Sequence, residues 1–207
     1  MNKMTARYVT ILLLLCLPQS LISQSSESLE WQIRFLSGTK MESLPIDEII
    51  MMENGSEFRL VITPDLDSYC YVISYGSDRQ IDVLHNQILK GGTPLYLGPV
   101  RIYGVSGAGN ATETLYVIMS LSRQINLERL IEYFDKNKGS QQHTNNLYRE
   151  IVRLQRAVSI LGESPSEIIT SGGTTRSTDK TDNIGQSLAT KFSGKEIYVI
   201  PIAISHK

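Results

Sequence analysis

The chain has little cysteine, little histidine and no excess of basic charge, and each shortage excludes a class of protein. Its 207 residues include two cysteines and three histidines, too few for a zinc site or a disulfide framework. Lysine and arginine number 20 against 21 acidic residues, so the concentrated basic surface that nucleic acid requires is missing. We therefore expect no metal, no cofactor and no nucleic-acid partner.

The apolar run near the N-terminus is too short for a membrane span. It covers residues 8–17 ("YVTILLLLCL"), whereas a transmembrane helix needs about 20 apolar residues. Lys3 and Arg7 precede it, and Pro18 and small polar residues follow it, which is the pattern of a secretory signal peptide. We predict a signal peptide over residues 1–23 and no stable transmembrane span in the mature chain; a retained anchor is the alternative.

The residue before Cys16 argues against lipidation. Leu15 is large, whereas a lipoprotein signal places a small residue there, so we do not expect an outer-membrane lipoprotein. We expect an exported protein, periplasmic or associated with the cell envelope. Residues 24–207 would hold 18 basic and 21 acidic residues, and their length suits a single domain. Cys70 would be the one remaining cysteine, so no internal disulfide forms and stability comes from the core.

The mature chain up to about residue 122 reads as short strands. Trp31, Ile33 and Phe35 alternate with polar residues, as in a half-buried strand. Glycine and proline separate this run from five more, over residues 57–63, 68–75, 81–86, 94–105 and 112–122. Strands of this length and spacing are typical of an antiparallel sandwich or barrel.

After about residue 122, the spacing of apolar residues changes from that of strands to that of helices. Apolar residues at helical spacing predict a helical hairpin over residues 126–162, with Asn126 as the first N-cap and Gly139 as the stop between the helices. The second helix is predicted from about residue 146, and the apolar stripes are expected to cover the sheet.

The last part of the chain combines a polar stretch with a strand. Residues 163–194 are mostly Ser, Thr, Gly, Asp and Lys and predict a flexible loop. Residues 195–205 predict a final strand that completes the sheet, with Pro201 at an edge or a bulge. The expected fold is mainly β (α+β): an antiparallel β-sandwich-like domain with an inserted αα-hairpin before the C-terminal strand.

The order of these segments resembles the bacterial family catalogued as domain of unknown function 4384. The resemblance covers about residues 50–122, and the last strand may extend it, on five motifs: Phe58–Thr63, Asp67–Ile73, Leu84–Asn86, Gly91-Gly92 and Thr112–Ser120. His85 stands where the family tends to have a Phe-Pro pair. The resemblance implies an exported or membrane-associated β-rich module, sometimes joined to kinase-like or caspase-like domains, without established catalytic residues.

Cys70 and His85 are the candidate catalytic pair. If Gly76–Arg79 forms the turn of a regular hairpin, Cys70 opposes His85 and a thiolate–imidazolium contact is within reach. Asp82 falls on the opposite face from His85 and so does not orient the imidazole. A turn longer or shorter by one residue would separate the pair.

The same register places Cys70 beside apolar residues. Val72, Ile81 and Val83 would share its face, and such surroundings raise the pKa of a thiol. We favour a buried, unreactive cysteine over a nucleophile.

Tyrosines provide the candidate ligand-binding residues. Tyr69, Tyr71 and Tyr75 fall on one side of the same predicted hairpin, where aromatic rings can form a platform for a glycan or a peptide. The alternative, which we favour, is that these rings pack in the core or beneath the two helices.

Three further patterns suggest sites but have simpler explanations. Arg149, Arg153 and Arg156 line one face of the second predicted helix, which suits either an anion contact or a solvated face, and we favour the latter. The glycines of residues 104–109 lead into a strand and not into a helix, unlike a phosphate-binding loop. Asp65 and Asp67 lack the further oxygen ligands of a calcium site.

Taken together, the sequence favours an exported, non-catalytic binding or interaction module of the bacterial cell envelope or periplasm, with a protein or envelope component as its partner. One alternative is a small-ligand or glycan sensor that uses the tyrosine face. The other is a Cys-His hydrolase.

Overall fold

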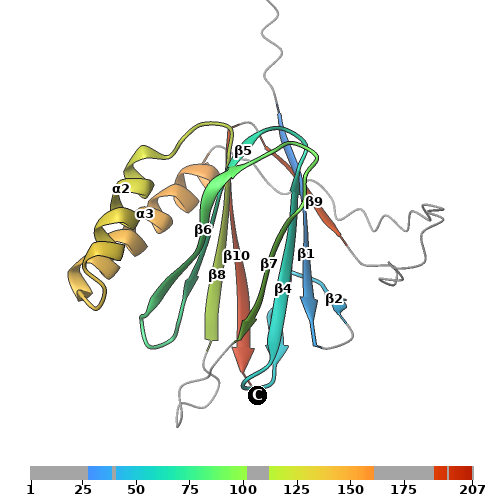
Figure 1. The fold of residues 1–207 in the computed structure, drawn as a ribbon, viewed down its shortest axis with the longest axis horizontal. Helices are drawn as coiled ribbons and strands as arrows, with labels where there is room; N and C mark the ends of the chain where they lie inside the picture. The colour runs from blue at the N-terminus through green and yellow to red at the C-terminus, as the bar shows by residue number, and fades with distance from the viewer. Residues whose placement is uncertain (1–27, 39–40, 102–111, 161–188, 195, 207) are drawn as a thin grey trace, which may run out of the picture.

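Two mainly antiparallel sheets face each other in the computed structural model, and two helices cover one of them (Figure 1). The structure describes residues 28–38, 41–101, 112–160, 189–194 and 196–206. Sheet A contains β1 (Leu29–Ser37), β2 (Glu42–Leu44), β4 (Glu57–Pro64), β7 (Leu95–Arg101) and β9 (Thr190–Gly194). Sheet B contains β3 (Ile50–Met52), β5 (Ser68–Tyr75), β6 (Ile81–Leu89), β8 (Thr112–Ser120) and β10 (Ile197–His206). The predicted α+β sandwich-like fold is confirmed.

In sheet A, β1 has neighbours on both sides. It pairs with β4 along one edge, and along the other edge it pairs with β9 near its start and β2 near its end. β7 continues the sheet beyond β4. Sheet B has the order β3-β10-β8-β5-β6, and every pairing in it is antiparallel except the short parallel contact of β3 with β10.

The inner faces of the two sheets form the main core. Alternation along each strand sends every second side chain inward, so apolar residues of both sheets meet there. The largest side chains in it that are almost fully buried are Trp31, Phe35, Leu29, Ile33, Leu60, Ile62, Leu115 and Met119. The Trp31 ring stacks on Phe192 of β9 with 4.8 Å between ring centroids, which joins the late strand to the first one.

The helices α2 (Ile125–Lys136) and α3 (Gln141–Ile160) cover the outer face of sheet B, as predicted. Their buried stripes pack on β5, β8 and β10, and consist of Leu127, Ile131, Phe134, Leu147, Ile151, Leu154 and Val158. The prediction of Asn126 as N-cap was wrong, because the helix begins at Ile125 after Gln124. Gly139 lies in the turn between the helices with a φ of 88°, a backbone conformation that favours glycine.

The prediction of a loop over residues 163–194 was wrong at its end. Residues 190–194 form β9, whose Phe192 is buried although its neighbours are polar. Residues 163–188 lie outside the described residues. Pro201 of β10 is exposed and pairs with Tyr116 of β8, while β3 reaches only residues 204–206 on the other side. The strand is therefore locally an edge at Pro201, as predicted.

In the described part of the chain, no helix combines the length and the hydrophobicity that crossing a membrane would require.

Candidate functional site

The predicted pairing of Cys70 with His85 is wrong. Cys70 lies opposite Gln87, and His85 lies opposite Val72. Two irregularities cause the shift. The turn runs from Gly76 to Gln80, one residue longer than predicted, and a bulge between Val72 and Ile73 leaves Leu84 without a partner on β5.

The longer turn moves Ile81 and Val83 to the other face of the sheet, and the bulge then moves His85. Ile81 and Val83 pack beneath the helices and not beside Cys70, which lies in the core between the sheets. Asp82 and His85, expected on opposite faces, lie opposite Ser74 and Val72, which alternation places on the same face of β5.

The surroundings of Cys70 and His85 suppress the chemistry of a catalytic pair. Cys70 is 0% exposed, and this burial strongly raises the pKa of its thiol. Burial lowers the pKa of His85 from its ordinary value of 6.5, and its Nε2 atom is buried without a hydrogen-bond partner. The geometry thus offers neither a thiolate nor a base in contact with it.

The three candidate tyrosines lie beneath the helices. Tyr71 is buried there, and Tyr69 and Tyr75 pack against the same cluster. The Tyr75 ring stacks on Tyr148 of α3, with 4.2 Å between ring centroids. Their faces are therefore occupied by the protein itself, as the packing interpretation expected.

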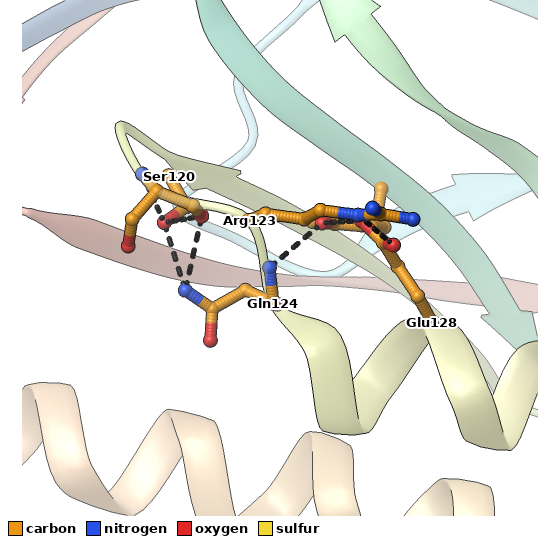
Figure 2. A network of polar contacts seen from close by, with 6 residues as sticks. Ser120, Arg123, Gln124 and Glu128 are labelled. Carbon is orange, nitrogen blue, oxygen red and sulfur yellow. Dashed lines mark hydrogen bonds and ion pairs between the residues drawn. The ribbon is translucent and has the colours of Figure 1, made fainter.

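A polar network fixes the connection between β8 and α2 (Figure 2). The Tyr71 hydroxyl donates to Glu128 Oε1 at 2.8 Å and accepts from the Gln124 backbone N–H at 3.1 Å. Gln124 Nε2 donates to Ser120 Oγ at 2.9 Å, and Arg123 forms an ion pair with Glu128. Burial of Tyr71, which is 1% exposed, raises the pKa of its hydroxyl, so this group stays a proton donor. The network positions α2 on the sheet.

Within the part of the chain that the structure describes, the remaining sequence motifs do not form a metal site. Asp67 accepts hydrogen bonds from Lys90 and from the backbone of Gly91, which makes it part of a turn. His143 is hydrogen-bonded to Ser140. Among the described residues, no group of three or more His, Cys, Asp or Glu side chains is arranged to hold a metal ion. The glycines of residues 104–109 lie outside the described residues.

A cavity between the two sheets is the best candidate for a functional site. It measures about 300 Å³ and lies where the β5–β6 turn meets the adjacent ends of β7, β8 and β10. Its apolar wall consists of Phe58, Leu84, Val100, Leu115 and Ile204, and its polar wall consists of Ser74, Gly76, Asp78, Gln80, Asp82, Arg101, Glu113 and Thr114. The cavity combines an apolar wall with a larger number of polar groups, whereas ligand pockets are usually mostly apolar, so any ligand held here is expected to be partly polar or charged.

Two of its carboxylates lie on the inner face of sheet B. Asp82 pairs with Ser74, whose other neighbour is the core residue Leu115, and Glu113 pairs with the core residue Ile204. Cross-strand partners share a face, so both acids lie on the inner face, where Asp82 is exposed and Glu113 is partly exposed, although the inner positions of β8 beyond Glu113 are apolar. Residues that break the pattern of their own strand in this way are expected mainly at functional sites.

The carboxylates also interact with one another. Burial, and then the charges of Asp78 and Asp82, raise the pKa of Glu113 above its ordinary value of 4.5. Arg101, which lines the cavity with these acids, is held by Glu57, whose Oε1 lies 2.8 Å from Arg101 Nε. Within the described residues, no lysine or arginine forms an ion pair with Asp78 or Asp82. A ligand with a positive charge would relieve the repulsion among these acids.

Sequence reasoning missed this site because Asp82 and Glu113 looked like ordinary polar positions. The sequence did contain a signal for Glu113. This residue lies two positions before Leu115, and Leu115, Val117 and Met119 are the inner residues of β8, so the alternation of the strand places Glu113 on the inner face as well. For Asp82 the bulge at Leu84 hides the same signal, because it breaks the period of β6.

Comparison of the chain with known proteins finds no relative: no family model, no curated protein and no solved structure matches it. The resemblance to domain of unknown function 4384 therefore stays a prediction.

Proposed function

We propose that the protein is an exported, non-catalytic binding module of the bacterial envelope or periplasm, and that it binds its partner through the cavity beside the β5–β6 turn. The partner presents a cationic group on an apolar stem, such as a lysine side chain of a protein or an amine of an envelope component. The observation that carries this proposal is the position of Asp82 and Glu113 on the inner face of the sandwich, beside an apolar wall.

The shape and chemistry of the cavity support a ligand of this kind. A volume of about 300 Å³ is at the small end of ligand pockets, and suits a side chain or a small amine better than a large cofactor. Phe58, Leu84 and Leu115 can contact an alkyl stem while the carboxylates contact its charge. Asp78 belongs to the tight turn, where its Oδ1 accepts from the Gln80 backbone N–H at 2.9 Å, so one of the acids is held in place.

Calorimetric titration with small probes tests the proposal. We expect the peptide acetyl-Gly-Lys-Gly-amide to bind, and the same peptide with an acetylated lysine to bind at least tenfold more weakly, because acetylation removes the charge. Asp82→Asn combined with Glu113→Gln should weaken binding of the first peptide by a similar factor.

The matched control is Asp47→Asn combined with Glu48→Gln. It removes the same charge from two exposed residues that do not line the cavity, and should leave the affinity unchanged. Equal affinity for the two peptides would overturn the assignment of the cavity, as would an equal effect of the two double variants.

Cross-linking and affinity purification of the tagged protein from its native envelope fraction tests the wider proposal. A partner recovered by the wild type and by Cys70→Ser, and lost with the Asp82→Asn and Glu113→Gln double variant, is the expected result. A partner that depends on Cys70 instead would favour the alternative of thiol chemistry.

A further inference from the structure

The outer surface of the two helices carries a second feature, which the proposed function does not use. At about 100° per residue, Ile125, Arg129 and Tyr133 lie along the side of α2 opposite its buried stripe. Arg149, Val152, Arg153 and Arg156 do the same on α3. The helices lie side by side over sheet B, so both rows face away from the sandwich (Figure 1). We refer to these seven residues as the outer helical face.

Basic charge is concentrated in the two helices and the turn between them. Residues 125–160 hold six lysines and arginines against four aspartates and glutamates, whereas the chain as a whole has a net charge of −1. Two of the four acids are engaged within the layer, since Glu132 pairs with Lys136, and Glu150 binds Arg153 at 2.7 and 2.8 Å. Among the described residues, no carboxylate forms an ion pair with Arg149 or Arg156.

Apolar side chains are exposed within the same surface. Ile125 is 70% exposed and Tyr133 is 49% exposed, although each helix already buries an apolar stripe against sheet B. On α3, a shallow open depression runs over Val152 and Ala157 between the arginines. Packing of the sandwich does not explain these exposed residues, because they make no contribution to either core cluster.

We propose that the outer helical face docks on the surface of an anionic lipid membrane. The arginines match the charge of acidic headgroups, and Tyr133 and Ile125 suit the boundary between headgroups and acyl chains, where amphipathic residues are enriched. The depression between the arginines is shallow and open, and the basic residues of the outer helical face are spread over both helices. Such a distribution of charge fits a plane of many anions better than one small anion.

Sedimentation of the full chain with lipid vesicles tests this inference. The comparison uses phosphatidylcholine vesicles and vesicles that also contain about one third phosphatidylglycerol. Residues 8–17 are present in every variant, so the informative quantity is the ratio of binding to anionic and to neutral vesicles. We expect Arg149→Gln, Arg153→Gln and Arg156→Gln together to lower that ratio roughly 100-fold, since each basic residue near the surface contributes about fivefold.

The matched control is Arg59→Gln, Arg79→Gln and Lys90→Gln together, which removes three basic charges from exposed positions on the strands and turns. We expect it to retain anionic binding. Ile125→Ser with Tyr133→Ser should weaken binding to anionic vesicles while leaving the arginines in place, and unchanged circular dichroism would confirm that each variant is folded.

Three outcomes would overturn the inference: equal binding to the two kinds of vesicle, an equal loss in the two triple variants, or full displacement by soluble polyglutamate at low concentration. The last outcome would assign the outer helical face to an acidic protein partner instead of a membrane. Loss of anionic binding at high salt is part of the expected result, because exposed charges are screened over about 10 Å at 0.1 M salt.

Discussion

Tyr71 of β5 and Glu128 of α2 are joined by a hydrogen bond of 2.8 Å, although 57 residues separate them along the chain. The same hydroxyl accepts the Gln124 backbone N–H at the start of α2. One buried side chain therefore fixes both the position and the first turn of the helical layer on sheet B.

Replacing Tyr71 by phenylalanine tests the strength of this connection. Phenylalanine preserves the packing but leaves the Gln124 N–H and one oxygen of Glu128 without their partner, so we expect a loss of about 1–2 kcal/mol in the free energy of unfolding. Urea titration measures it. Tyr133→Phe, at an exposed position, should leave the urea midpoint nearly unchanged; an equal effect of both variants would contradict the role of the hydroxyl.

Replacing Phe192 by alanine tests whether β9 is an integral strand. The ring is buried and stacks on Trp31, so its removal should cost roughly 3 kcal/mol in the free energy of unfolding. Lys191→Ala, on β9 like Phe192, breaks a surface ion pair with Glu30 of β1 and should barely move the urea midpoint. A small loss for Phe192→Ala would mean that β9 detaches readily from β1.

Reactivity of Cys70 distinguishes a core residue from a nucleophile. In a Cys16→Ala background, we expect no labelling of Cys70 by iodoacetamide at pH 8 in the native protein and complete labelling in urea. The reason is that burial both excludes the reagent and raises the pKa of the thiol. Rapid native labelling would restore the hydrolase alternative.

Glu113 should make stability depend on pH in a direction set by its raised pKa. An acid whose pKa is higher in the folded state stabilises the fold below its ordinary pKa of 4.5, and this contribution is lost as pH rises through the folded-state pKa. We therefore expect Glu113→Gln to be more stable than wild type at pH 7 by a few tenths of a kcal/mol, allowing for solvent screening of this half-buried group.

Thermal unfolding from pH 4 to pH 8 measures the Glu113 effect. The difference in Tm between Glu113→Gln and wild type should grow as pH rises and then level off. A variant that is less stable than wild type at pH 7 would show that the ionised carboxylate is stabilised by a partner in the folded protein.

The spacing of apolar residues along the chain predicted most strands and both helices of the fold. The strand Glu57–Pro64 was visible because every second residue is apolar, Thr112–Ser120 was visible as a short apolar run, and the helical layer was visible because its apolar residues recur at helical spacing. β9 was missed because a single apolar residue, Phe192, lies in a polar stretch, and its pairing with β1 depends on a contact 161 residues away in sequence.

The candidate site was harder to predict than the fold. Neither the longer turn nor the bulge at Leu84 has a distinct signature in the sequence, yet the two together moved His85 away from Cys70, and the longer turn placed Asp82 on the inner face. The predicted site residues were correctly located on β5 and β6, but their partners were not.

The sequence by itself determined the class of fold and most of its strands and helices, because these depend on local period and on composition. Only the tertiary structure decided which side chains meet. Register and bulges are set by packing between distant strands, and a shift of one residue moves a side chain to the other face of its sheet. That is why Cys70 is buried in the core, why the tyrosines lie beneath the helices, and why Asp82 and Glu113 line the same cavity.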